Sequence, residues 1–239
     1  MVLKRNLFGW RFEEYWFDEP GYLSSRADIA ALRTHGIAGR DVPSHCRIPE
    51  KTLVVPLERS EEEILAGFAT RARTSIRQAQ KTVEVRLAAA PEERRLFYEA
   101  YLPFAAGKGL LVPNPDEEEE LEIFLARNRE GELLQAAAFL PAPREKIYRY
   151  RYGVYVRKSQ ANAILIQAAM GRARNLGAAF FDLGGVTPGA RPGSPEAGIN
   201  FFKSQFGGVE MPCLLHLRGA RPAPCALLSL LQATGLAAR

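Results

Sequence analysis

The sequence has little of what builds disulfide frameworks or metal centres. Its 239 residues include three cysteines, which are Cys46, Cys213 and Cys225. An odd number of cysteines without CxxC spacing favours free thiols in a reducing compartment, so we expect a cytoplasmic protein. The three histidines are scattered and form no HExxH motif. These absences argue against a metal site.

Long apolar runs are also missing. No stretch reaches the roughly 18 apolar residues that a membrane-spanning helix requires. The N-terminal residues mix charged and aromatic side chains, unlike the apolar segment of a signal peptide. The GxSxG motif of many hydrolases is absent too, because Ser194 lies between Gly193 and Pro195. We therefore expect neither a transmembrane segment nor a serine hydrolase.

The composition that is present is typical of a globular protein with anionic partners. Apolar residues make up 47% of the chain and charged residues 25%, which is enough for one large core. Lys and Arg number 32 against 27 Asp and Glu, a net charge of +5. This excess favours phosphate groups or RNA as partners. No basic tail of the nucleic-acid-binding kind is present, and we expect no DNA partner.

The first half of the chain contains one clear helix signal. Residues 7–17 and 52–57 predict strands, with a loop and a short helix over 28–34 between them. Ser60 and Glu63 form a capping box, so we expect a helix from there to about Lys81. Its apolar stripe and a basic row each recur at four-residue spacing. The stripe is Ile64, Phe68, Ala72 and Ile76, and the row is Arg73, Arg77 and Lys81.

The rest of the chain alternates strand and helix patterns. Strands are predicted over 83–87, 132–140, 146–156, 178–183 and 211–217, and helices over 91–106, 159–176 and 222–236, with another opening at Pro115. The order predicts an α/β (α+β) protein with a single core. Residues 1–50 are expected to form an N-terminal strand and loop elaboration that packs on a domain formed by residues 51–239.

The strand predicted over 146–156 carries candidate binding residues. Alternation along a strand places its tyrosines on one face and its arginines on the other. The tyrosines are Tyr148, Tyr150 and Tyr152, and the arginines are Arg149 and Arg151. Both arginines, with Arg73 and Arg77 upstream, are candidates for binding phosphate groups. Tyr150 is a candidate for lying against an acceptor, with a core or sheet-face position as the alternative.

Two motifs resemble the FemAB-like branch of the GNAT acyltransferase superfamily. The first is DLGG followed by NFFK and FGG, over residues 182–208, where the family has a D-x-G-G strand end before an FK-x-x-FGG helix end. The second is RTSIRQAQK, residues 73–81, which is similar to the family's R-x-x-I-R-x-A-x-K helix. The resemblance covers about residues 52–217 and is strongest over 146–210.

The resemblance implies a fold and an activity. A GNAT-like fold is a mixed β-sheet flanked by helices, in which donor and acceptor meet where two central strands splay apart. Better-known family members attach amino acids from aminoacyl-tRNA to the stem peptide of the peptidoglycan precursor. The resemblance therefore implies an acyl- or aminoacyl-transferase that forms an amide bond on an amine-bearing, phosphate-containing acceptor in cell-wall-related metabolism, with tRNA as a partner.

The same resemblance gives roles to the motif residues. Lys203 is expected to stabilise the oxyanion of a tetrahedral intermediate or to contact a substrate phosphate, with Phe202 packing beneath it. Asp182 is expected to orient the attacking amine or accept its proton, with capping of the next loop as the alternative. Gly184 and Gly185 allow tight turning and close approach of the backbone. Lys203 and Asp182 are thus the predicted catalytic residues.

The identity of the donor stays open. GNAT proteins that bind acetyl-CoA hold its pyrophosphate on an R/Q-x-x-G-x-G/A loop at a helix start. Here Gln160 and Asn162 replace glycines, although Arg157 and Lys158 are candidates for binding donor phosphates. No cofactor is firmly predicted beyond aminoacyl-tRNA or acyl-CoA as donor substrate. The alternatives are a CoA-dependent N-acyltransferase acting on a small amine and a non-catalytic RNA- or anion-binding module.

Overall fold

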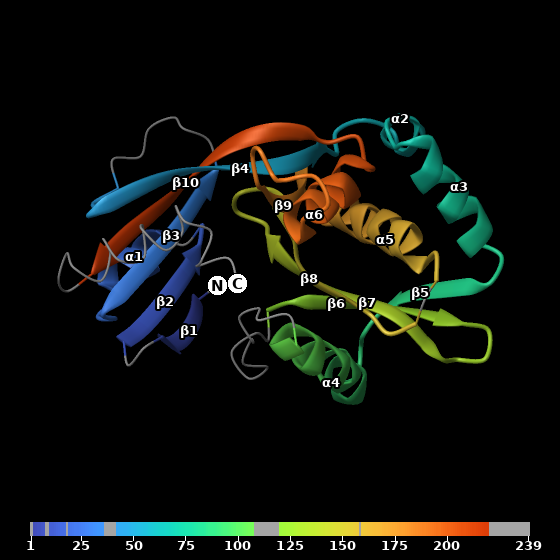
Figure 1. The fold of residues 1–239 in the computed structure, drawn as a ribbon, viewed down its shortest axis with the longest axis horizontal. Coiled ribbons are helices and arrows are strands. Elements are labelled where there is room, and N and C mark those ends of the chain that lie inside the picture. Colours follow the sequence, from blue (N-terminus) through green and yellow to red (C-terminus); the bar gives the residue numbers. More distant parts are fainter. Residues whose placement is uncertain are drawn as a thin grey trace. The chain divides into compact units, whose positions relative to one another are not determined.

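The computed structural model describes residues 2–7, 10–17, 19–35, 42–107, 120–157 and 159–219. These residues form two compact units (Figure 1). Unit 1 draws its described residues mainly from Met1–Lys51 and Met211–Arg239, and unit 2 comprises Thr52–Phe104 and Glu120–Glu210. Strands β4 (Cys46–Pro56) and β10 (Val209–Gly219) each continue from one unit into the other.

The described part of unit 1 is built on strands in the order β1-β2-β3-β10. Its own elements are β1 (Val2–Leu7), β2 (Trp10–Trp16), α1 (Glu19–Ser24) and β3 (Ile29–His35). β1 and β2 form an antiparallel hairpin, so the single strand predicted over 7–17 is in fact the second half of a hairpin. β2 and β3 are parallel, and β3 is antiparallel to β10.

Both faces of β3 are buried. Ile29 and Ala31 pack into one apolar cluster, whereas Ala30 and Leu32 pack into another. A strand buried on both faces reads as a continuous apolar run, which periodicity does not distinguish from a buried helix. The short helix predicted over 28–34 is therefore wrong, because pairing with β2 and β10 makes this segment a strand.

Unit 2 contains a mixed sheet in the order β4-β9-β8-β7-β6-β5. The strands not yet given are β5 (Val83–Leu87), β6 (Glu122–Asn128), β7 (Leu133–Ala142), β8 (Ile147–Tyr155) and β9 (Phe180–Val186). Strands β5 to β8 are antiparallel neighbours, and β8 and β9 are parallel. All of these strands except β6 were predicted from the sequence.

Helices cover both faces of this sheet (Figure 1). They are α2 (Glu61–Ala66), α3 (Thr70–Ala79), α4 (Pro91–Gly107), α5 (Ala161–Asn175) and α6 (Pro195–Ser204). α5 packs against α3 on one side of the sheet, and α4 lies on the other side (Figure 1). The main apolar core lies between α5 and the sheet, with Phe139, Leu165 and Phe181 fully buried.

The predicted capping box is confirmed, but the helix that it opens is shorter than expected. The Ser60 side chain accepts a hydrogen bond from the N–H of Glu63, whose carboxylate accepts one from the N–H of Ser60. α2 ends at Ala66 with Gly67 as its C-cap, and α3 begins only at Thr70. The break coincides with a tertiary contact, since a Cβ added at Gly207 would lie 2.3 Å from the Gly67 carbonyl oxygen. The predicted apolar stripe is nevertheless buried on both sides of the break.

Some sequence predictions lie beyond the described residues. These are the helix opening at Pro115 and the helix over 222–236. The helices predicted over 91–106 and 159–176 are found as α4 and α5. Within the described part of the chain, no helix is both long and apolar enough to cross a membrane.

Candidate functional site

The parallel strands β8 and β9 separate after a short paired segment. Their register joins residues 147–149 to residues 180–182 and ends with the pair Arg149 and Asp182. Beyond this pair β8 continues to Tyr155 and β9 to Val186. Backbone and side-chain groups at such a divergence are not committed to the ladder, so they can face a ligand. Several predicted site residues lie here.

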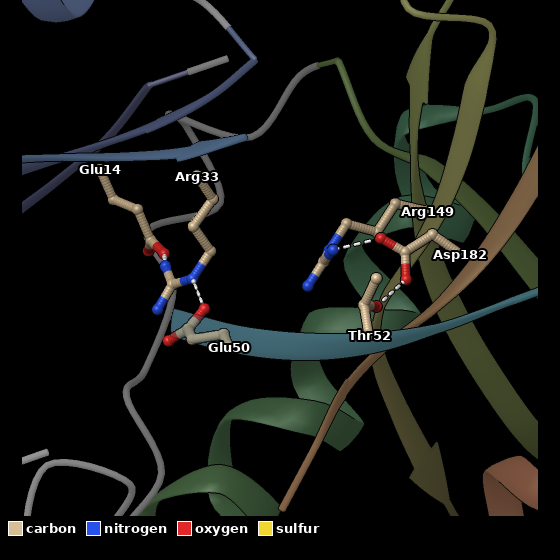
Figure 2. A network of polar contacts seen from close by, with 6 residues as sticks. All are labelled: Glu14, Arg33, Glu50, Thr52, Arg149 and Asp182. Atoms are coloured by element: carbon tan, nitrogen blue, oxygen red, sulfur yellow. Dashed lines mark hydrogen bonds and ion pairs between the residues drawn. The ribbon is translucent and has the colours of Figure 1, made fainter. Parts of the chain in front are cut away.

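Asp182 is a buried carboxylate at this point, with 0% exposure. One of its oxygens accepts hydrogen bonds from the Thr52 hydroxyl and, at 2.7 Å, from the N–H of Gly184. The other oxygen pairs with the guanidinium of Arg149 (Figure 2). Donors therefore occupy both oxygens. This is the loop-capping geometry that the sequence analysis left as the alternative for this residue.

Lys203 is brought to the same place by α6, which begins at the N-cap Ser194. It lies in the last turn, is only 8% exposed, and donates a hydrogen bond from Nζ to the carbonyl oxygen of Gly185. Burial, and secondly the charge of Arg149, lower the pKa of Lys203 from 10.5 to about 8, while Asp182 opposes the shift. The ammonium is therefore charged at neutral pH but readily loses its proton above it.

Gly184 allows the ammonium to lie close to the backbone. Its φ is +89°, a conformation that residues with a side chain rarely adopt. An added Cβ would lie 3.3 Å from Nζ of Lys203 and 3.9 Å from a terminal nitrogen of Arg149. The backbone conformation therefore favours glycine, and an added methyl group would make the Lys203 ammonium shift from its position. We call Lys203, Asp182, Arg149 and Gly184 the Lys203 centre.

Two aromatic side chains lie next to the Lys203 centre in the sequence and pack against the main core. The ring centroids of Tyr150 and Phe202 are 6.4 Å apart, and Phe202 meets Phe206 edge-on at 5.2 Å. Burial raises the pKa of the Tyr150 phenol, so it stays protonated at neutral pH. Tyr150 thus has the sheet-face position that the sequence analysis kept as its alternative.

A β-bulge changes the direction of the next residues of β8. The register against β7 passes directly from Tyr150 to Tyr152, so Arg151 is the extra residue. Tyr152 contacts Tyr101 of α4, with ring centroids 5.1 Å apart, and the Arg151 guanidinium lies 5.1 Å from the Tyr152 ring. The prediction that Tyr148, Tyr150 and Tyr152 share one face is therefore wrong for Tyr152, because the bulge moves it to the face that α4 covers.

The remaining predicted binding residues have other surroundings. Arg73 donates to a backbone carbonyl and to a hydroxyl near the start of its own helix, and Arg77 is exposed on α3. Arg157 forms a salt bridge of 2.8 Å with Glu132. Lys158 lies outside the described residues. None of these described contacts joins the arginines to the Lys203 centre.

The FGG sequence that follows α6 is a packing requirement. Gly207 has a φ of +67°, and its close approach to Gly67 leaves no room for a side chain. Phe206 meets Phe68 edge-on, with centroids 5.3 Å apart. These contacts fix the end of α6, and because Lys203 lies in its last turn they also fix the position of the ammonium.

The structure adds polar residues that the sequence did not reveal. Thr52 is fully buried and bonded to Asp182, but it stands at the start of an apolar run that carries no chemical signature. In unit 1, Arg33 pairs with Glu14 and, at 3.0 Å, with Glu50 (Figure 2). The Arg33 guanidinium also lies 4.8 Å from the Trp16 ring. Only folding brings these residues together, so no spacing rule could have found them.

Comparison with known proteins identifies the fold. No protein-family model matches the sequence, and no curated protein sequence matches it. Among solved structures, FemX is similar over 97% of this chain and 86% of its own, with a TM-score of 0.62 and 14% identity. The C-terminal domain of a candidate lysylphosphatidylglycerol synthetase from Agrobacterium fabrum is similar over 87% and 72%, with a TM-score of 0.57 and 18% identity. L-PGS from Bacillus licheniformis is similar over 88% and 73%, with a TM-score of 0.56 and 15% identity.

The fold is that of the FemAB-like GNAT branch. The predicted fold class, a GNAT-like mixed sheet flanked by helices, is confirmed. The divergence of β8 and β9 is the feature that the sequence analysis expected from this FemAB-like fold. At these low identities the likeness establishes the fold, and the chemistry has to be argued from the residues of this chain.

Proposed function

We propose that the protein transfers an aminoacyl group from aminoacyl-tRNA to an amine acceptor and so forms an amide bond. The observation that carries this proposal is a buried ammonium, Lys203, held beside a glycine turn where β8 and β9 diverge. The FemAB-like motifs support aminoacyl-tRNA as the donor. The likeness of the fold to FemX and to L-PGS is in keeping with this class of reaction.

Aminoacyl transfer needs a group that stabilises negative charge on oxygen. The amine nitrogen attacks the ester carbonyl carbon, a C–N bond forms, and the C–O bond to the tRNA ribose breaks while the amine proton passes to the ribose oxygen. Between these steps the carbonyl oxygen is an oxyanion, which a fixed cation stabilises. Lys203 is charged below about pH 8 and is held by the Gly185 carbonyl, so it can supply that charge with little reorganisation.

The other residues of the site receive supporting roles in this proposal. Asp182 acts as a positioning residue, because its oxygens are occupied by donors that include Gly184 and Arg149. Arg149 keeps the surroundings of Lys203 positive, because its charge helps to lower the pKa of that lysine. Tyr150 and Phe202 pack against each other and against the main core, and so hold the strand and the helix that carry Arg149 and Lys203.

The acceptor and the cellular location follow from the same resemblance. We assign the acceptor to cell-wall precursors and the reaction to the cytoplasm, where aminoacyl-tRNA is made. CoA-dependent acyl transfer is the weaker candidate. Asn162, which stands where a CoA-binding loop has glycine, accepts a hydrogen bond from Gln135 at 2.7 Å and donates one to Tyr155. That side chain occupies the start of α5 and hinders backbone contact with a pyrophosphate.

The test is product formation by the full chain. Total tRNA charged with radiolabelled amino acids is the donor, and peptidoglycan precursor carrying a stem peptide, phosphatidylglycerol or no acceptor is added in separate reactions. We expect label in an alkali-stable amide product, with the peptidoglycan precursor as acceptor. Label in the lipid instead would overturn the acceptor assignment, and acetyl transfer from acetyl-CoA alone would overturn the donor assignment.

Lys203→Met tests the role of the ammonium. Loss of one oxyanion-stabilising group typically lowers kcat by about 100- to 1000-fold, and we expect a loss of that size. Lys146→Met, which removes an exposed lysine of the same unit, is the matched control and should keep full activity. A Lys203→Met protein as active as the control would contradict the proposed mechanism.

A further inference from the structure

Unit 2 has a second cluster of cationic side chains, outside the Lys203 centre. It lines a hollow of about 470 Å³ formed by β5, β6 and the turns at 80–82 and 128–131. Its lining includes the cations Lys81, Arg86, Arg127 and Arg129 and one carboxylate, Glu84. We call it the cationic hollow. A pocket of this size and sign is suited to an anionic ligand.

The sequence builds the cationic hollow through strand alternation. The apolar residues of β5 pack against the main core, so the alternate residues Glu84 and Arg86 point to the opposite face. Arg127 of β6 pairs in register with Glu84 and therefore shares that face. A register shift in β6 lies between Ala126 and Arg127, a kind of irregularity that redirects a side chain.

Two arginines of the hollow, Arg127 and Arg129, are oriented by backbone carbonyls. Arg127 donates to the carbonyl oxygen of Gly131 at 2.7 Å, and Arg129 donates to that of Lys81 at 2.6 Å. A backbone carbonyl fixes a guanidinium but leaves its net charge in place. Nε of Arg127 is buried and has no acceptor among the described residues. Arg86 differs, because it forms a salt bridge of 2.5 Å with Glu93.

Helix α3 runs toward the turn that precedes β5 (Figure 1), and Lys81 in that turn lines the hollow. Arg73 and Arg77 lie on α3, and Lys81 lies in the turn just after its end at Ala79, so three cations follow one another at four-residue spacing along the chain. A single small anion would use one cation of such a row. A polymer with regularly repeated phosphates can use several at once, which favours a nucleic acid strand over a free ion.

We propose that the cationic hollow, with the basic row Arg73, Arg77 and Lys81, binds backbone phosphates of the tRNA donor. This rests on aminoacyl-tRNA being the donor in the proposed function. Lys81 and Arg129 hold phosphates at the mouth of the hollow, where both side chains are exposed. Arg127, which lines the wall of the hollow, donates a hydrogen bond to a phosphate. The site positions the RNA and takes no part in the bond-making step, which stays at the Lys203 centre.

The experiment measures binding of uncharged total tRNA to the full chain over a range of KCl concentrations. The test variant is Lys81→Ala with Arg129→Ala, which keeps the Lys81 carbonyl. The control is Arg95→Ala with Arg144→Ala, which removes two exposed cations of the same unit that do not line the hollow. Each lost phosphate contact lowers the salt slope by roughly 0.7 to 0.9. We expect a slope lower by about 1.5 and affinity at least tenfold weaker for the test variant only.

Several results would overturn this inference. The first is a test variant that binds tRNA as tightly as the wild type, and the second is a control variant whose tRNA affinity falls as much as that of the test variant. The others are a wild-type chain that does not bind tRNA, and displacement of tRNA by inorganic phosphate at an equal concentration of phosphate groups. Thermal unfolding of each variant identifies any loss caused by misfolding, and Lys81→Gln with Arg129→Gln then serves as the milder pair. Lys203→Met should bind tRNA normally. If the wild type transfers the aminoacyl group and the test variant binds tRNA as the wild type does, only this inference is contradicted. If the wild type binds tRNA through the hollow but forms no transfer product, only the proposed function is contradicted.

Discussion

The Lys203 centre and the cationic hollow, the two cationic regions of unit 2, differ in burial and in charge pairing. In the Lys203 centre the positive side chains are buried, and a buried carboxylate, Asp182, pairs with Arg149. In the cationic hollow, Lys81 and Arg129 are exposed, and backbone carbonyls hold Arg127 and Arg129. Burial strengthens electrostatic interactions and shifts a pKa, whereas an exposed charge is accessible to a ligand and its interactions are screened by salt. The first arrangement suits chemistry at one atom, and the second suits capture of a charged polymer.

Removing the buried carboxylate should have the largest effect on stability. Asp182→Ala leaves Arg149 and Lys203 as buried cations, and breaking a buried pair in this way costs about 3–5 kcal/mol. For a chain of this size, each kcal/mol lowers Tm by roughly 2–4 °C, so calorimetry should show a fall of about 10 °C. Arg129→Ala in the hollow is the comparison and should cost within about 0.5 kcal/mol. An equal fall in Tm for Asp182→Ala and Arg129→Ala would show that charge pairing matters no more for stability in the Lys203 centre than in the cationic hollow.

The pKa of Lys203 predicts a stability that depends on pH. Between about pH 8 and 10.5 the folded chain has released a proton that the unfolded chain still binds, so the free energy of unfolding rises with pH in this window. Below pH 8 both states are protonated and the cost of burying the charge is fully present. The complete effect is about 3 kcal/mol.

Urea unfolding of the wild type and Lys203→Met from pH 7 to pH 10 measures this effect. The free energy of unfolding of the wild type should increase relative to that of the variant as pH rises through 8. Other titrating groups are common to both proteins and largely cancel in the difference. A difference that stays constant over this range would mean that Lys203 titrates like an ordinary surface lysine.

Gly184→Ala should have a smaller effect on stability and a separate effect on activity. The left-handed backbone costs a residue with a side chain about 1–2 kcal/mol, and the new methyl group would press on the Lys203 ammonium. Gly177→Ala is the matched control, because Gly177 has a φ of +75° with nothing within 4 Å of an added Cβ. We expect both variants to be destabilised by a similar amount and only Gly184→Ala to lose transfer activity. Similar activities for the two would show that the ammonium does not need its position beside this backbone.

Sequence predictions were accurate where residues close together in the chain determine the local structure. The Ser60 and Glu63 capping box starts a helix because its hydrogen bonds are made within one turn. The DLGG and FFKSQFGG motifs contain Asp182, Gly184 and Lys203 of the Lys203 centre, and Gly184 is favoured by its own positive φ. These features depend on neighbours in the chain, which a sequence displays directly.

Predictions that depended on distant partners failed more often. β3 was predicted as a helix, and β6 was not predicted, because each is an apolar segment whose pairing with other strands decides its form. The bulge at Arg151 moved Tyr152 to the other face, although strict alternation predicted otherwise. The helix expected as far as Lys81 was interrupted where Gly207 meets Gly67.

The sequence by itself determined the FemAB-like motifs, the position of Lys203 in a helix and the basic row. Only the tertiary structure decided that Asp182 is held by Thr52 and Arg149, that Lys203 is buried with a lowered pKa, and that the row ends at a hollow. The physical reason is that burial and charge pairing depend on which segments meet in space. A linear pattern records the residue types but not the solvent or the partners that each will have.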